Sequence, residues 1–172
     1  MQRLFIICGI SGTGKTTLAH DIAKRIGGMV ITSERVISEM FPKNIRADAD
    51  RDFSADELEK GYEAMMQHIA AALAEGKQVV ADGVFRSHKQ RERVRSIAAK
   101  LQIPSSLIYV TCPDAVAKER IASRFHAGKQ QGGLHAQEFI RSVFEPPQSF
   151  DLHVDTSLPY EQQIGDFLKA LT

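Results

Sequence analysis

The residues best suited to chemistry in this chain of 172 residues form one glycine-rich segment, Gly9 to Thr16, with the sequence GISGTGKT. It fits the pattern G-x-x-x-x-G-K-[ST] at every fixed position. Glycines let successive backbone N–H groups curl around a triphosphate, at the positive end of the following helix. In such a loop Lys15 reaches the β- and γ-phosphates, and the Thr16 hydroxyl is a ligand of Mg²⁺. The pattern therefore predicts a P-loop with these nucleotide-binding residues: Gly9, Ser11, Gly12, Thr13, Gly14, Lys15, Thr16 and Thr17.

The flanking segments supply the setting that a P-loop requires. Leu4 to Cys8 is an apolar run suited to a buried parallel strand. After the loop, apolar residues recur at helical spacing from Leu18 to Ile26, and Gly27 ends the pattern. A strand, the loop and a helix in this order favour phosphate binding over an ordinary glycine-rich turn with a solvated lysine. The catalytic class stays open, because kinases, GTPases, motors and switches share this loop.

Two carboxylates come at or just after the ends of predicted strands. Glu34 is the first acid after the strand Met29 to Thr32, and Asp82 lies near the end of the strand Gln78 to Gly83. Ligands gather at the carboxyl ends of strands in parallel α/β sheets. Glu34 is the candidate base for an acceptor hydroxyl, or it merely favours the dipole in the first turn of a short helix. Asp82 is the candidate carboxylate for the Mg²⁺ shell, and it could instead hold the acceptor or cap the next turn.

Two arginines could stabilise the transferred charge. Arg120 and Arg124 are four residues apart on a predicted helix, so they share one face. Phosphoryl transfer spreads negative charge over equatorial oxygens, and arginines on a closing element stabilise it. The polar, glycine-containing stretch that follows suits a mobile lid over about residues 125–138. The alternative is two surface arginines before an ordinary loop. Thr156 and Ser157, after the last predicted strand, are weak candidates for contacts to the nucleotide base.

The remaining segments continue an alternation of strands and helices. Ser54 and Glu57 make a capping box before a long helix that ends at Gly76. Ser106 to Cys112 and Leu152 to Asp155 are further predicted strands. We therefore predict a single α/β domain over residues 1–172, with a P-loop NTPase fold. Its five-stranded parallel sheet is flanked by helices, and it is nucleoside-kinase-like with a lid.

The composition indicates no dominant charged or membrane partner. With 22 Lys and Arg against 21 Asp and Glu, the net charge is +1, so only a local patch such as Arg86 to Arg95 could bind nucleic acid. One cation near the start of that run could reach a phosphate. The apolar runs are too short for a bilayer, and no signal peptide begins the chain, so we expect a cytoplasmic protein with no membrane partner. Cys8 and Cys112 are expected to pack as small apolar side chains.

In order and spacing, these segments resemble the predicted small P-loop kinases related to zeta toxins, chloramphenicol phosphotransferase and polynucleotide 5′-kinases, an AAA-type ATP-binding group. By that likeness the P-loop would hold ATP, Glu34 would stand where the group has an Asp acting on the acceptor hydroxyl, and Arg120 or Arg124 would be the lid arginine. The segments that carry the resemblance are Gly9 to Thr16, Thr32 to Glu34, Val79 to Asp82 with Arg91 beyond, Glu119 to Arg124, Phe144 to Pro147, and Val154 to Ser157.

One departure from the group concerns the acceptor site. The group usually has an Arg three residues after its Asp, and this chain has Ile37 there. Either Arg35 substitutes for that arginine, or the acceptor site is altered or lost. We expect a phosphotransferase that moves the γ-phosphate of ATP, with Mg²⁺, to a hydroxyl of a small molecule. The alternatives are a polynucleotide 5′-hydroxyl as acceptor, which is possible but not favoured, and a nucleotide-binding switch with little turnover.

Overall fold

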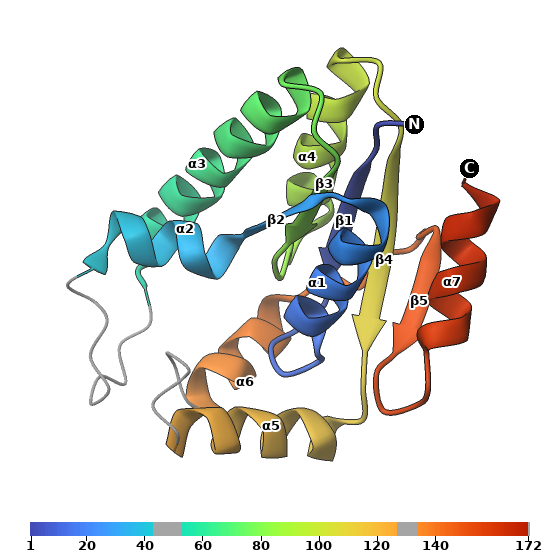
Figure 1. The fold of residues 1–172 in the computed structure, drawn as a ribbon. Helices are drawn as coiled ribbons and strands as arrows, with labels where there is room; N and C mark the ends of the chain where they lie inside the picture. The colour runs from blue at the N-terminus through green and yellow to red at the C-terminus, as the bar shows by residue number, and fades with distance from the viewer. Residues whose placement is uncertain (43–52, 127–133, 172) are drawn as a thin grey trace.

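A computed structural model of the chain describes residues 1–42, 53–126 and 134–171 (Figure 1). In this part of the chain the strands form one sheet in the order β2-β3-β1-β4-β5. Every pairing between neighbouring strands is parallel, so the predicted five-stranded parallel sheet is confirmed. The strands are β1 (Leu4–Cys8), β2 (Met29–Thr32), β3 (Val79–Asp82), β4 (Ser105–Thr111) and β5 (Leu152–Asp155).

Helices follow the strands along the chain and cover both faces of the sheet, and α5 and α6 lie beyond the carboxyl ends of the strands (Figure 1). No helix among the described residues combines the length and the apolar character needed to span a bilayer. The helices are α1 (Lys15–Ile26), α2 (Ser33–Met40), α3 (Ala55–Ala74), α4 (His88–Lys100), α5 (Asp114–His126), α6 (Leu134–Val143) and α7 (Glu161–Ala170).

The central strand β1 divides the core into two layers, because alternate residues of a strand point to opposite faces. Leu4, Ile6 and Cys8 pack with α3 and α4 in one apolar cluster. Phe5 and Ile7 pack with α1 and α7 in the other. Every side chain of β1 is at most 2% exposed. A strand covered on both faces reads as a continuous apolar run, which is why the first strand was recognisable in the sequence.

Local signals fix the helix ends. Gly14 before α1 and Gly27 after it adopt left-handed conformations, with φ of 86° and 64°. At α3 the predicted capping box is present: the Ser54 hydroxyl accepts from Glu57 N at 3.2 Å, and the Glu57 carboxylate accepts from Ser54 N at 2.8 Å. Ser87 caps α4 by accepting a hydrogen bond from the backbone of the third helical residue.

The parallel register brings the ends of three strands to one edge of the sheet. Asp82 at the end of β3 is paired with Ile7 of β1 on one side and with Thr32 of β2 on the other. The P-loop leaves β1 just beyond Ile7, and α2 begins directly after Thr32. The loop, Asp82 and the first turn of α2 therefore meet at the carboxyl edge, where ligands bind in open α/β sheets.

Some predicted boundaries differ from the structure. The strand predicted from Ser106 to Cys112 spans Ser105–Thr111, and the helix predicted from Glu34 starts one residue earlier. Of the predicted lid, residues 125–126 belong to α5 and 134–138 to α6, while 127–133 lie outside the described residues. Residues 43–52, between α2 and α3, also lie outside them.

Helices α2 and α3 are in close contact beside the site. Ile37, the position where the resembling group usually has an arginine, is only 4% exposed and packs on Gly61 of α3. A Cβ atom at Gly61 would overlap Ile37 Cγ1, so glycine is required there by close approach of the two helices. The position of α2, and with it the position of Glu34, depends on this contact.

We predict that Gly61→Ala lowers the free energy of unfolding by about 1–3 kcal/mol, because the added methyl group overpacks the contact with Ile37. Urea unfolding measures the change. Gly165→Ala in α7 is the matched control, since the nearest atom to its new Cβ, Arg25 Nη1, is 3.8 Å away. Replacing a helical Gly by Ala there should be neutral or stabilising. Equal effects of the two variants would contradict the close-approach interpretation.

Candidate active site

The P-loop has the conformation of an anion cradle. Gly12 (φ 81°) and Gly14 (φ 86°) adopt backbone angles that side chains rarely allow. A Cβ at Gly12 would lie 2.7 Å from Ala117 O, so the loop also packs directly on α5. The Thr13 hydroxyl donates to Ile10 O at 2.9 Å and closes the loop from within. The loop thus leads, without a bulky side chain in its way, into the N-terminus of α1.

Lys15 is a buried cation at the base of this cradle. Its side chain is 9% exposed, and its Nζ donates to Ile10 O at 2.8 Å. Burial lowers the pKa of Lys15, and the nearby Asp82 carboxylate opposes that shift. An ammonium group held in low dielectric beside a row of backbone N–H groups is suited to bind phosphate oxygens.

Thr16 and Asp82 form a pair of oxygen ligands next to the lysine. The Thr16 hydroxyl donates to Asp82 Oδ2 at 2.7 Å. The other carboxylate oxygen, Oδ1, is buried and has no hydrogen-bond partner among the described residues. Hydroxyl and carboxylate oxygens are the ligands that Mg²⁺ prefers, and the unpartnered Oδ1 leaves one of them available. No group of three or more His, Cys, Asp or Glu side chains in the described part of the chain could hold a metal ion, so Mg²⁺ would need oxygens of the nucleotide and water as well.

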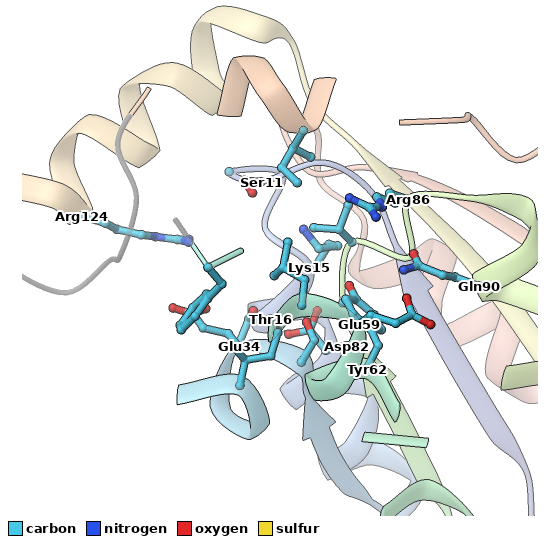
Figure 2. A pocket seen from close by; sticks show the side chains of 18 residues that line it. Ser11, Lys15, Thr16, Glu34, Glu59, Tyr62, Asp82, Arg86, Gln90 and Arg124 are labelled. Carbon is cyan, nitrogen blue, oxygen red and sulfur yellow. Dashed lines mark hydrogen bonds between the residues drawn. The ribbon is translucent and has the colours of Figure 1, made fainter. Parts of the chain in front are cut away.

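Glu34 lies in the first turn of α2 and also lines the pocket. The surrounding protein partly desolvates its carboxyl group, which raises the pKa of Glu34, and Asp82 raises it further. Arg124 and Lys15 oppose the shift. Figure 2 shows Glu34 close to Thr16 and Asp82, with Lys15 across from it. The site therefore places a carboxylate of raised pKa beside the phosphate cradle.

The two predicted arginines of α5 have different surroundings. Arg124 lines the pocket and extends into it from one side (Figure 2). Arg120 does not line this pocket and instead bonds to the P-loop and the loop after β5. Its guanidinium donates to Thr156 Oγ1 at 2.8 Å, to Thr156 O at 3.2 Å and to Gly12 O at 3.4 Å. Of these two arginines, Arg124 is therefore the one that lines the pocket together with Lys15.

Thr156 connects the same loop to the P-loop. Its hydroxyl donates to Thr13 O at 2.7 Å while it accepts from Arg120. A Cβ at Gly14 would lie 3.2 Å from the Thr156 hydroxyl, so the two segments are in direct contact. Thr156, which the sequence marked only as a weak candidate for the nucleotide base, thus supports the backbone of the P-loop.

The second half of the pocket comes from α3, α4 and the loop between β3 and α4. Apart from Arg86, which begins the basic run, its polar residues belong to no motif in the sequence. In Figure 2 the labelled side chains of this half lie on the opposite side of Lys15 from Arg124. They are Glu59, Tyr62, Arg86 and Gln90. Glu59 and Tyr62 are three residues apart, so the sequence places them on one face of a helix. The sequence does not show that this face lies beside the P-loop.

The predicted nucleotide-binding residues divide into two sets. Some line the pocket, namely Ser11, Gly12, Lys15 and Thr16. Others do not line it: Gly9 and Thr13 are buried in the loop, Gly14 caps α1, and Thr17 is exposed on the first turn of α1.

Arg35 does not substitute for the arginine that Ile37 replaces. Its side chain is 77% exposed and forms an ion pair with Glu39 at 2.7 Å, one helical turn away on α2. Arg35 is also absent from the pocket lining. Of the two alternatives for this position, the structure does not support substitution by Arg35, because its side chain is turned away from the pocket.

The basic run that begins at Arg86 is not a free cationic surface. Arg91 is 3% exposed and donates to Phe85 O. Arg93 pairs with Glu59 at 2.7 Å and also with Glu63, and Arg95 pairs with Asp151 at 3.5 Å. Most of these cations are therefore buried or neutralised within the protein.

Comparisons with known proteins agree with this geometry. A family model described as AAA domain (AAA_33) matches residues 4–147. An adenylyl-sulfate kinase from Halothermothrix orenii is 23% identical over 150 residues, which cover 86% of this chain and 77% of that protein. The structure of the APS kinase from Mycobacterium tuberculosis, in complex with AMPPNP and APS, aligns with a TM-score of 0.71 at 17% identity, covering 99% of this chain and 97% of that one. A gluconokinase from Sinorhizobium meliloti aligns with a TM-score of 0.72 at 19% identity, covering 97% and 90%. The prediction of a P-loop kinase fold is confirmed, and a P-loop kinase is the enzyme class that these similarities support.

We predict that Thr156→Val raises the Kd for AMPPNP about tenfold, because it leaves Thr13 O and Arg120 without their shared hydroxyl partner and loosens the P-loop. Isothermal titration calorimetry measures the Kd. Thr156→Ser keeps the hydroxyl and is the control, with an expected Kd close to that of the wild type. A Val variant that binds as tightly as the Ser variant would contradict this role of Thr156.

Proposed function

The chain belongs to the AAA domain family AAA_33, and from this premise we propose that it transfers the γ-phosphate of ATP to a hydroxyl group of a small-molecule acceptor. One observation carries the proposal: a single pocket is lined by the P-loop lysine, the Thr16–Asp82 pair and the Glu34 carboxylate. Residues 1–172 would act as one kinase domain, with the segment around 125–138 as its lid.

The residues have complementary roles in this proposal. Lys15 and the P-loop N–H groups hold the β- and γ-phosphates, and Arg124 binds charge that develops on the transferred group. Thr16 and Asp82 would hold Mg²⁺, which neutralises phosphate charge when it is bound. Glu34 orients the acceptor hydroxyl and takes its proton. A general base works best when its pKa approaches the operating pH, so the raised pKa of Glu34 suits the role.

The finer assignment to the group of zeta toxins, chloramphenicol phosphotransferase and polynucleotide 5′-kinases remains part of the proposal. Glu34 at the position of that group's Asp supports it, and Ile37 at the position of its Arg departs from it. A polynucleotide acceptor is the less favoured alternative, because the arginines that would follow a nucleic-acid backbone are largely buried or paired.

The direct test is transfer of label from γ-labelled ATP, with Mg²⁺, to pooled acceptors: nucleosides, sugars and nucleotide sugars, aminoglycosides, and a 5′-hydroxyl oligonucleotide. Label in a small-molecule pool supports the proposal and gives the acceptor class. Label only in the oligonucleotide, with steep salt dependence, supports the alternative. Tight ATP binding without transfer to any pool would instead indicate a nucleotide switch.

We predict that Lys15→Met lowers transfer at least ~10²- to 10³-fold, because it removes the cation that stabilises charge on the phosphates. Steady-state kinetics with the identified acceptor measure the loss. Lys24→Met on the exposed surface of α1 is the control and should leave transfer unchanged. Unchanged transfer in the Lys15 variant would exclude the P-loop as the phosphate site.

We predict that kcat falls as the pH drops through the raised pKa of Glu34, because a protonated carboxyl cannot take the acceptor proton. The midpoint of this acid limb should lie above the ordinary value for Glu, about 4.3. Glu34→Gln should remove the limb and lower kcat about 10²- to 10⁴-fold while ATP still binds. Glu39→Gln on the same helix should keep the wild-type profile. An unchanged acid limb in the Glu34 variant would exclude Glu34 as the base.

A further inference from the structure

Arg86 lies in the half of the pocket formed by α3, α4 and the loop between β3 and α4. Its side chain is partly buried and lines the pocket, and it forms no hydrogen bond or ion pair with any described residue. The nearby acids are directed elsewhere. Glu59 pairs with Arg93 at 2.7 Å, and the carboxylate of Glu145 accepts from His88 N at 2.8 Å. A partly desolvated guanidinium without an acid favours an anion from outside the chain.

The backbone before Arg86 is held in a fixed and unusual conformation. Phe85 is fully buried and has φ of 44°, a left-handed value that is uncommon for a bulky residue. Two bonds hold it there: its N donates to the Tyr62 hydroxyl at 3.3 Å, and its O accepts from Arg91 at 2.8 Å. Such conformations persist where their surroundings determine them, and they concentrate at ligand sites. The loop therefore presents Arg86 to the pocket in a preorganised way.

Gln90 provides a second, independent sign of a ligand. Its side chain is 7% exposed and lines the pocket, and its Oε1 is buried without a hydrogen-bond partner among the described residues. Buried polar atoms are nearly always hydrogen-bonded, so an unpartnered amide at a pocket wall indicates a group that a ligand supplies. Figure 2 shows Gln90 and Arg86 on the same side of the pocket, across Lys15 from Arg124.

We propose that the acceptor is a small hydroxyl compound that also carries an oxyanion, with Arg86 binding the oxyanion and Gln90 accepting a hydrogen bond from a neighbouring hydroxyl or N–H group. The inference rests on the proposed kinase function and defines its substrate class. The oxyanion is a carboxylate, a phosphate or a sulfate, each of which the planar guanidinium binds with two parallel hydrogen bonds. Arg86 and Gln90 determine specificity and take no part in moving the phosphoryl group.

The first arm of the test compares acceptors that differ only in the anion: glycerol with glycerate, ribose with ribose 5-phosphate, and glucose with glucose 6-sulfate. We expect the anionic member of at least one pair to be phosphorylated with a higher kcat/KM, and the pair identifies the oxyanion. Arg86→Gln should lower that kcat/KM about 10- to 100-fold while the KM for ATP is unchanged. Arg86→Lys should restore part of the loss, since it keeps the charge without the planar geometry.

Two further variants separate specificity from folding. Gln90→Glu should raise the KM for the anionic acceptor more than for its neutral partner, because a second negative charge would face the oxyanion. Arg35→Gln is the control, since its side chain is exposed and paired with Glu39. Urea unfolding midpoints confirm that each variant is folded. Equal kcat/KM for both members of every pair, or transfer only to an oligonucleotide, would overturn the inference.

The second arm does not require turnover. The protein is saturated with AMPPNP and Mg²⁺, so that the P-loop is filled, and binding of labelled sulfate and of labelled phosphate is measured by equilibrium dialysis. We expect binding that Arg86→Gln weakens at least tenfold and Arg35→Gln leaves unchanged. Anion binding without transfer to any acceptor would support the subsite while the kinase proposal fails. No binding, or equal binding by both variants, would overturn the subsite even if transfer to neutral acceptors is found.

Discussion

The buried ammonium of Lys15 is the interaction on which the site depends. A cation in low dielectric is costly unless polar groups surround it, and here Ile10 O, the Asp82 carboxylate and Glu34 lie close enough to act on it. Those groups come from three segments whose positions the parallel register of β1, β2 and β3 determines. The sheet therefore brings together the groups that offset the cost of burying the Lys15 charge. The oxygens of a bound triphosphate would add to them.

The close packing of α2 on α3 affects which elements supply guanidinium groups to the pocket. Ile37 is committed to the contact with Gly61, and Arg35 points to solvent, so α2 contributes a carboxylate but no cation to the pocket. Guanidinium groups come instead from α5, through Arg124, and from the loop after β3, through Arg86. The absence of an arginine from this face of α2 therefore does not leave the pocket without guanidinium groups.

The parts of the site that could be predicted from sequence are those encoded locally. The P-loop is a contiguous pattern, and Glu34 and Asp82 follow apolar runs that end at the same edge of the sheet. The parts that could not be predicted depend on tertiary contacts. Arg120 and Arg124 share one helical face, and the contacts of Arg120 with Thr156 and Gly12, which distinguish the two, exist only in the folded chain. Gln90 belongs to no motif in the sequence, and only the folded structure shows that its amide is buried beside the pocket.

The bonds of Arg120 and Thr156 connect segments from opposite ends of the chain. They join the P-loop near the start of the chain to α5 and to the segment between β5 and α7. Segments tied in this way tend to lose and regain structure together, as one cooperative unit. The first loop of the fold and the segment that follows its last strand therefore depend on each other for their positions, although more than 140 residues separate them in the sequence.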